Sequence, residues 1–387
     1  MNIRITPAKL RGSIEAIASK SYAHRIIMAS ALSDKPTLIS LNGISKDIEA
    51  TVNAVKALGA NAVIGENEIR IEPIKLKEES PVIAVGESGT TARMILPIAS
   101  ALYQEGTLTG EGSLLKRPFA PLCDALSEHG ITFSSDMLPI KFKGNMNSGE
   151  YKISGSESSQ YISALMFALP LLKGESRITL TSPLASKGYV DITTDVLQSF
   201  GVSGGFETKG NERFISPERI KVEGDMSNAA FFLAAGIEVT GLNSDSKQKD
   251  KLFLSVKDNN EIDADDIPDL VPILAVYAAS RKGKTRIYNA ERLRIKESNR
   301  IESVHAMIKA LGGEIEVTES ELLINGRGGL LGGTVDSYND HRIVMSAAIA
   351  SCFCENEVMI KGAEAVNKSY PQFFLHFNSL GGKAYVE

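Results

Sequence analysis

A helix that ends at a glycine and continues into a short alternating strand recurs along this chain. The recurring segments are AVKALGANAVI, ALSEHGITFSS, VLQSFGVSGGF, AMIKALGGEIEV and FNSLGGKAYVE, and their glycines are Gly59, Gly130, Gly201, Gly312 and Gly381. The spacing is about 70 residues, except for one gap of about 110. Because a glycine after a helix readily adopts positive φ, the pattern predicts repeated α/β units, each with a helix packed on short strands.

The wide gap contains the polar stretch SDSKQKDKLFLSVKDNNE, which indicates a degenerate or trimmed repeat. Other repeats continue through a turn into a second strand, as in NAVIGENEIRIEPI and GEIEVTESELLINGRG. The length of 387 residues suggests about two to three domains. Repetition of whole units favours two similar lobes over a single Rossmann sheet.

Charge and composition restrict the partners of such a chain. The net charge of −5 argues against a nucleic-acid coat or a polybasic membrane anchor. The N-terminal MNIRITPAKL lacks the apolar region of a secretory signal, and the longest apolar run, ISALMFALPLL, is too short to span a bilayer. The odd count of three cysteines disfavours a disulfide framework, and Cys352 and Cys354, without a second pair, do not favour zinc. We expect a cytoplasmic protein with no metal, no nucleic acid and no membrane as partner.

Lysine or arginine stands at the start of at least six predicted helices, where the helix dipole disfavours a cation. In ASKSYAHRIIMASAL, Lys20 precedes the helix, Ser21 is the predicted N-cap and Arg25 lies one turn inside. In VGESGTTARMIL, Gly89 lets the backbone approach a ligand and Arg93 follows. That turn lacks the lysine ending of a Walker loop, so a P-loop nucleotide hydrolase is disfavoured. The other cations at helix starts are Arg117, Lys296, Arg300, Arg342 and Lys368.

Polar and acidic groups occupy the same kind of position. Ser158, Ser159 and Gln160 stand at the mouth of an apolar helix, where they can cap it or hold phosphate oxygens. Ser186 is placed comparably, and Asp269 heads another helix, where a carboxylate is electrostatically favoured.

Two local predictions concern the segment RLRIKESNRIE. Ser298 is the predicted cap of the helix there, and Arg292 and Arg294 alternate with apolar residues as on a strand.

Each of these groups also has a plain structural explanation. The segment around Lys20 could be a solvated turn, Glu297 could form a surface ion pair with Lys296 or Arg300, and His341 could be a hydrogen-bonded structural histidine. If the helix starts converge, however, they create a positive cavity suited to phosphates and carboxylates together. Asp269, Glu297, His341 and Lys20 are then the candidates for acid–base chemistry.

Ten segments resemble, in order, the motif series of the 5-enolpyruvylshikimate-3-phosphate synthase family. They are SKSYAHR, GESGTTAR, KRPFAPL, SSQYISAL, SKGYVDIT, VEGDMSNAAFFLAAG, IPDLVPILAV, RIKESNRI, YNDHRIVM and NKSYPQFF, and the match runs from near Lys9 to the C-terminus. The resemblance implies an α/β fold of six βαβαββ units, three in each of two domains, with helix N-termini facing an interdomain cleft. It implies one domain of residues 1–19 with 224–387, and an inserted domain of residues 20–223.

The reaction implied by the resemblance transfers the enolpyruvyl group of phosphoenolpyruvate to the 5-hydroxyl of shikimate 3-phosphate, releasing phosphate, in chorismate and aromatic amino-acid biosynthesis. It proceeds through a tetrahedral intermediate and uses no cofactor. Asp269 is implied as the base for the 5-hydroxyl proton, Glu297 and Lys20 in proton transfer at the methylene carbon and leaving phosphate, and His341 in support of Glu297. The implied shikimate 3-phosphate ligands are Lys20, Ser21, Arg25, Ser158, Ser159, Gln160, Ser186, Asp269 and Lys296. The implied phosphoenolpyruvate ligands are Lys20, Gly89, Arg117, Gln160, Arg300, Arg342 and Lys368.

The chain departs from the family pattern at three positions. Glu87 stands where many members have Asn, which adds negative charge beside the implied phosphoenolpyruvate site; Met94 replaces a residue that is often Pro or Leu. Arg292 stands where some members have an Asn that touches the phosphorylated shikimate. These departures leave the reaction intact but leave phosphoenolpyruvate affinity and glyphosate sensitivity open.

Two alternatives have different signatures. UDP-N-acetylglucosamine enolpyruvyl transferases share the implied fold and donor but usually carry a reactive cysteine before the arginine, and GEGSLLKR here has none. An inactive sensor of anionic metabolites would lack an acid–base residue, whereas Lys20, Asp269, Glu297 and His341 are all present. A two-lobed enzyme of this size needs no partner subunit, so we expect a monomer.

Overall fold

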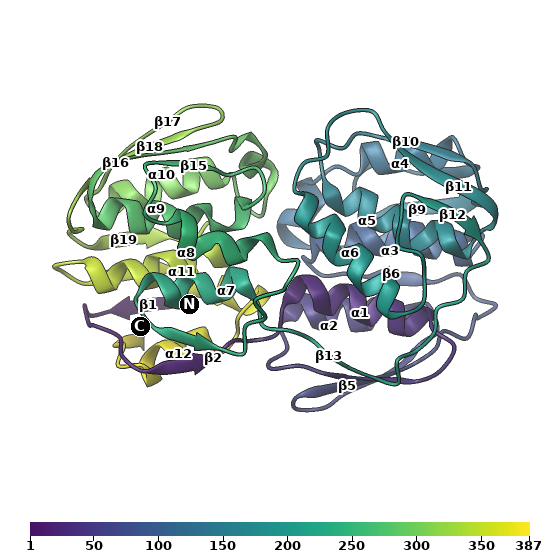
Figure 1. The fold of residues 1–387 in the computed structure, drawn as a ribbon, viewed down its shortest axis with the longest axis horizontal. Helices are drawn as coiled ribbons and strands as arrows, with labels where there is room; N and C mark the ends of the chain where they lie inside the picture. The colour runs from purple at the N-terminus through teal and green to yellow at the C-terminus, as the bar shows by residue number, and fades with distance from the viewer. The chain divides into compact units, whose positions relative to one another are not determined.

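The computed structural model describes residues 1–387, which fold into two compact units (Figure 1). One unit combines Met1–Ile17 with Gly224–Glu387, and we call it the terminal unit; the other, the inserted unit, is Ala18–Glu223. Both chain ends belong to one sheet, because β1 (Asn2–Ile5) pairs antiparallel with both β20 (Val358–Lys361) and β21 (Ala384–Val386). No helix combines the length and apolar character needed to cross a membrane.

The α-helices are distributed evenly between the units. The α-helices of the inserted unit are α1 (Lys20–Leu32), α2 (Lys46–Ala57), α3 (Gly89–Leu102), α4 (Ala120–Ser127), α5 (Ser159–Ala168) and α6 (Lys187–Ser199). Those of the terminal unit are α7 (Met226–Ala234), α8 (Phe253–Val256), α9 (Val271–Ser280), α10 (Arg300–Ala310), α11 (His341–Ala350) and α12 (Phe373–Ser379). Short 3₁₀ helices are η1 (Gly112–Lys116), η2 (Leu169–Leu171), η3 (Lys249–Leu252), η4 (Pro268–Leu270), η5 (Glu291–Ile295), η6 (Ser351–Phe353) and η7 (Ala363–Lys368).

Each unit contains three small sheets. In the inserted unit they are β13 (Arg219–Lys221), β3 (Thr37–Ser40), β5 (Glu68–Glu72), β4 (Asn61–Ile64); β6 (Val82–Ala84), β7 (Glu105–Thr109), β9 (Ile140–Gly144), β8 (Ile131–Phe133); and β10 (Glu150–Ile153), β11 (Lys173–Leu180), β12 (Glu207–Gly210). In the terminal unit they are β19 (Gly333–Asp336), β20 (Val358–Lys361), β1 (Asn2–Ile5), β21 (Ala384–Val386); β15 (Glu261–Asp263), β16 (Lys282–Tyr288), β18 (Leu322–Arg327), β17 (Glu314–Val317); and β14 (Glu238–Thr240), β2 (Ser13–Glu15).

The sheets repeat one pairing scheme. Each four-stranded sheet has a parallel pair at one edge followed by two antiparallel pairs, as in β6–β7–β9–β8. The β14–β2 sheet keeps only the parallel pair. It lies beside the polar stretch in which the sequence indicates a trimmed repeat.

The glycines of the repeat have the predicted conformation. Gly59, Gly130, Gly201, Gly312 and Gly381 all have φ between 76° and 103°. A sixth, Gly236, has φ 79° after α7 and falls inside the wide gap, where spacing alone did not reveal it.

The core of each unit is built from helices that are buried on all sides. In α1 every residue from Tyr22 to Ala31 is buried, and in α11 every residue is buried. Helix α9 packs on β18 and α11 on β20, and Figure 1 shows both helices between sheets of the terminal unit. A helix that is apolar all round must lie inside a core. The cations at the starts of such helices are therefore partly or wholly withdrawn from water, so the solvated-turn explanation fails.

Three local predictions were wrong, two of helix caps and one of a strand. The cap of α1 is Ser19, whose backbone is extended, and Ser21 is already helical. The cap of α10 is Asn299, whose side chain accepts from the Glu302 N–H, while the Ser298 hydroxyl bonds Asp340 instead.

The segment 291–295 is a 3₁₀ helix and not a strand. Its two arginines donate to backbone carbonyls of neighbouring loops, Arg292 to Asp265 and Arg294 to Glu319. The alternation of polar and apolar residues there reflects a turn anchored at both sides.

Candidate active site

Arg25 is a buried cation in the inserted unit, with 1% of its surface exposed. Its Nε donates to Thr193 Oγ1 at 2.7 Å, and its Nη2 donates to the Tyr189 carbonyl at 3.1 Å and Ser163 Oγ at 3.3 Å. Its Nη1 donates to the carbonyl of Ser21 at 2.7 Å. Burial lowers the pKa of Arg25 to about 10, so it remains charged at neutral pH among these neutral acceptors.

Lys20 is the first residue of α1 and lies against the start of α2. Its Nζ is 2.8 Å from Asp47 Oδ2, and the Lys20 side chain is 16% exposed. Lys20 and Arg25 are thus one turn apart on α1, with Lys20 at the surface end.

The glycine turn before α3 carries two guanidinium groups. A Cβ built on Gly89 would lie 2.8 Å from Nη1 of Arg117 and 3.0 Å from Nη1 of Arg93. Gln160, near the start of α5, accepts from Arg93 Nη1 at 2.8 Å and donates to Thr90 at 2.9 Å. Only glycine allows this approach, and the resulting cluster of donors suits a carboxylate or a phosphate.

The serines expected at helix mouths occupy such positions. Ser158 caps α5 by accepting from the Gln160 N–H at 3.3 Å, and Ser159 is the first residue of that helix. Ser186 stands immediately before α6 in the left-handed region, with φ 52°.

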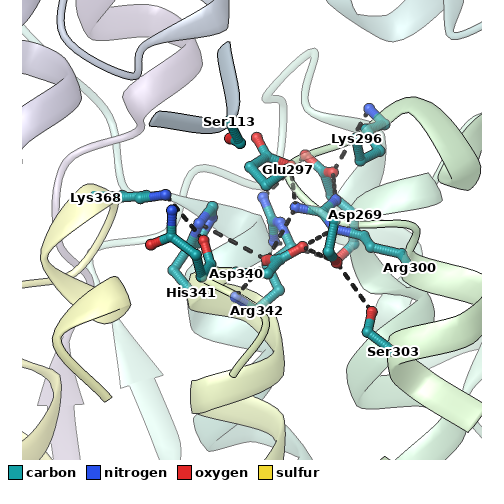
Figure 2. A network of polar contacts seen from close by, with 12 residues as sticks. Ser113, Asp269, Lys296, Glu297, Arg300, Ser303, Asp340, His341, Arg342 and Lys368 are labelled. Carbon is teal, nitrogen blue, oxygen red and sulfur yellow. Dashed lines mark hydrogen bonds and ion pairs between the residues drawn. The ribbon is translucent and has the colours of Figure 1, made fainter. Parts of the chain in front are cut away.

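Arg300 organises the polar network of the terminal unit (Figure 2). It is 1% exposed and donates to three carboxylates, which are Asp269 at 2.7 Å, Glu297 at 2.6 Å and Asp340 at 2.8 Å. Burial alone would lower the pKa of Arg300, but Asp340, Glu297 and Asp269 raise it well above its ordinary value. Three acceptors around one guanidinium fix its orientation before any ligand binds.

Asp269 lies among three cations. Arg300 bonds its Oδ1, Arg342 donates to its Oδ2 at 2.9 Å, and Lys296 Nζ is 3.8 Å from Oδ1. Burial would raise the pKa of Asp269, but Arg342, Lys296 and Arg300 together lower it well below its ordinary value. The pKa of Lys296 is lowered by its own burial, with Asp269 acting against that shift. The Asp269 carboxylate therefore occupies the place that an anionic ligand of these cations would take.

A family model described as EPSP synthase (3-phosphoshikimate 1-carboxyvinyltransferase) matches residues 5–243 and 236–377. The chain belongs to the EPSP synthase family. A relative from Clostridium perfringens named 3-phosphoshikimate 1-carboxyvinyltransferase is 40% identical and spans 98% of each chain. One of the same name from Brachyspira hyodysenteriae is 38% identical over 99% of each chain. An EPSP synthase structure from Acinetobacter baumannii, at 24% identity, superposes with a TM-score of 0.82 over 100% of this chain and 99% of that one. This likeness confirms the predicted two-domain α/β fold.

Within each unit, EPSP synthase motifs far apart in sequence lie together. The inserted unit joins Gly89, Arg117 and Gln160, and the terminal unit joins Asp269 with Lys296 and Arg300. The last group also includes Glu297, Arg342 and His341. Lys368, from η7, donates to the Asn339 carbonyl at 2.9 Å in the loop before α11.

Two residues of this chain were missing from the predicted ligand sets. Arg93 lies beside Arg117 over Gly89, and its place after the glycine turn was the available signal. Asp340 is fully buried, caps α11 through the Arg342 N–H, and accepts from Arg300. Its sequence neighbours His341 and Arg342 are predicted site residues, but only the fold shows that Asp340 holds a guanidinium from another helix.

Proposed function

We propose that this chain transfers the enolpyruvyl group of phosphoenolpyruvate to the 5-hydroxyl of shikimate 3-phosphate, in the biosynthesis of chorismate and aromatic amino acids. The names of its relatives support the reaction. The observation that carries the proposal is the Asp269 carboxylate held by Arg300, Arg342 and Lys296. Those three cations match a substrate with both phosphate and carboxylate groups, and the carboxylate among them is a base beside the acceptor hydroxyl.

The two substrates divide the site residues as the family motifs do. For shikimate 3-phosphate we propose Lys20, Ser21, Arg25, Ser158, Ser159, Gln160, Ser186, Asp269 and Lys296. For phosphoenolpyruvate we propose Lys20, Gly89, Arg117, Gln160, Arg300, Arg342 and Lys368. These sets draw on both units. The proposal therefore requires both domains expected from the sequence, residues 1–19 with 224–387 and residues 20–223, to act on the same two substrates.

Anion binding has a consequence for the base. While Arg300 and Arg342 bond Asp269, the pKa of this carboxylate is low and it is a weak acceptor of protons. When the carboxylate or phosphate of phosphoenolpyruvate takes over these guanidinium groups, the pKa of Asp269 rises because its charge is less compensated. Asp269 thereby becomes an effective base only when the donor substrate is present.

The reaction balances with the residues proposed. The 5-hydroxyl oxygen bonds C2 of phosphoenolpyruvate, its proton goes to Asp269, and C3 gains a proton to give a methyl group. The C2–O bond to phosphate then breaks, a proton leaves the methyl group, and enolpyruvyl ether and phosphate are formed. We assign the proton transfers at the methylene carbon and leaving phosphate to Glu297 and Lys20, with His341 supporting Glu297. No cofactor enters these steps.

Phosphate release by the purified chain tests the proposal. Phosphoenolpyruvate with shikimate 3-phosphate is expected to release phosphate, and phosphoenolpyruvate with UDP-N-acetylglucosamine is not. Release only with the second acceptor would overturn the proposal in favour of the other enolpyruvyl transferase. Tight binding of both substrates without release would favour the inactive sensor. We further propose that the chain is a cytoplasmic monomer. Sedimentation of the purified chain at assay concentration tests its oligomeric state.

A further inference from the structure

The segment that leads into Arg117 is bonded to the glycine turn before α3 through residues 111–113, several positions ahead of Arg117. The backbone N–H of Glu111 donates to the Gly86 carbonyl at 2.8 Å. Next along the chain, Glu87 Oε2 accepts from the Ser113 N–H at 3.3 Å and from its hydroxyl at 3.4 Å. The side chain of Glu87 thus bonds the first turn of η1, the 3₁₀ helix that leads into Arg117.

Gly112 makes this attachment possible. It has φ 56°, and a Cβ added to it would overlap Cδ and Oε2 of Glu87. The carboxylate therefore lies directly against the backbone at this glycine. Any side chain at residue 112 would displace it, so Glu87 and Gly112 form a fitted pair.

The other end of η1 meets the same turn. The 3₁₀ helix closes with the Arg117 N–H donating to the Leu114 carbonyl at 3.1 Å, and the Arg117 guanidinium lies over Gly89. The turn from Gly86 to Gly89 is hence bonded to the start of a five-residue element, and the guanidinium of the residue that follows this element lies against the same turn. Fixing one end of so short an element restricts where the other can go.

We propose that Glu87 is a positioning residue: its carboxylate holds η1 so that Arg117 stands over the start of α3 before the donor substrate arrives. The inference rests on the proposed function, in which Arg117 binds phosphoenolpyruvate. Holding a guanidinium in its binding geometry removes part of the ordering cost of association. The Glu87 carboxylate keeps its negative charge when it is bonded to Ser113, so the positioning of Arg117 must outweigh its repulsion of a bound anion.

Kinetics of Glu87→Ala test the proposal, with Glu87→Gln as the conservative variant and Glu111→Ala as the matched control. Glu111 is an exposed neighbour whose side chain makes no cap bond. We expect Glu87→Ala to raise KM for phosphoenolpyruvate about 2- to 12-fold, while kcat and KM for shikimate 3-phosphate stay within about twofold. Glu87→Gln keeps an oxygen acceptor for Ser113 and should restore most of the loss, and Glu111→Ala should resemble the parent chain.

Hydrogen exchange provides a readout that does not depend on turnover. Amides of residues 112–117 should exchange faster in Glu87→Ala than in the parent chain and in Glu111→Ala. The milder Ser113→Ala, which keeps the backbone N–H donor, should show a smaller change in the same direction. Unchanged exchange in this segment, tighter binding of phosphoenolpyruvate, or an equal rise of KM for both substrates would overturn the proposal. A parent chain that makes no product would defeat the proposed function alone, since the exchange comparison still decides the role of Glu87.

Discussion

Replacing Asp269 with asparagine should have opposite effects on binding and turnover. Its carboxylate bonds Arg300 at 2.7 Å and Arg342 at 2.9 Å, and a donor-substrate anion must displace it from at least one of them. Hydrogen bonds to charged groups contribute about 1.5–3 kcal/mol each, roughly twice as much as neutral ones. Asparagine therefore competes less, by about 1 to 3 kcal/mol in total, and phosphoenolpyruvate should bind about 5- to 150-fold more tightly. Turnover should fall by about 10²- to 10⁴-fold, because the base is lost.

Titration calorimetry with phosphoenolpyruvate alone, at fixed pH and ionic strength, measures the binding half of this prediction. Asp266→Asn is the matched control, since it removes one negative charge from the same loop. Phosphoenolpyruvate that binds Asp269→Asn no more tightly than Asp266→Asn would refute the reasoning. Asp269 would then serve to order the guanidinium groups and would not compete with the substrate for them.

Three further predictions concern stability. Asp340→Ala should lower the free energy of unfolding, measured by urea titration, by about 3–5 kcal/mol, because it breaks a buried ion pair with Arg300 and removes a helix cap. Asp340→Asn keeps an acceptor for the cap, so its loss of stability should be smaller by about 1 kcal/mol. Burial and nearby Asp269 raise the pKa of Asp250 to about 7, so the folded chain loses stability as pH rises from about 4 through 7. At pH 8, Asp250→Asn should therefore unfold at a higher urea concentration than the parent chain. At pH 4 it should not. Gly312→Ala and Gly236→Ala both place alanine at a φ of 79°, so each should cost about 1–2 kcal/mol of strain. The Gly312 variant should be the less stable of the two, because its Cβ would also overlap Leu331.

The pH dependence of stability that Asp269 causes has the opposite sign to that of Asp250, and acid titration provides a separate check of the contacts of Asp269. The pKa of Asp269 is depressed in the folded chain, so its contribution to stability is present above the ordinary value of 3.8 and is lost as pH falls through the folded value. The parent chain should therefore lose more stability than Asp269→Asn when urea unfolding is followed from pH 5 to pH 3. Parallel curves for the two chains would contradict the role of the three cations around this carboxylate.

The sequence predicted the repeat and the site's residue types better than its local geometry. Glycines after helices are required by positive φ, so Gly59 and Gly312 were visible in the sequence, whereas the irregular spacing concealed Gly236. Ser19 and Ser21 both precede an apolar run, and the choice between them depends on backbone angles that residue types do not encode. The contacts of Asp340 with Arg300 join segments 40 residues apart, which no local pattern can reveal. Cations at helix starts predicted an anion site, but not that Asp269 holds those cations in the absence of substrate.

The position of bond cleavage tests the central claim most directly. Phosphoenolpyruvate labelled with ¹⁸O in the bridging C–O–P oxygen is incubated with shikimate 3-phosphate and the purified chain, and both products are examined by mass spectrometry. Enolpyruvyl transfer breaks the C–O bond, so the label should appear in the released phosphate and the acceptor should gain the enolpyruvyl group. Label retained in pyruvate, with a phosphoryl group added to the acceptor, would mean that the P–O bond breaks and would contradict the account.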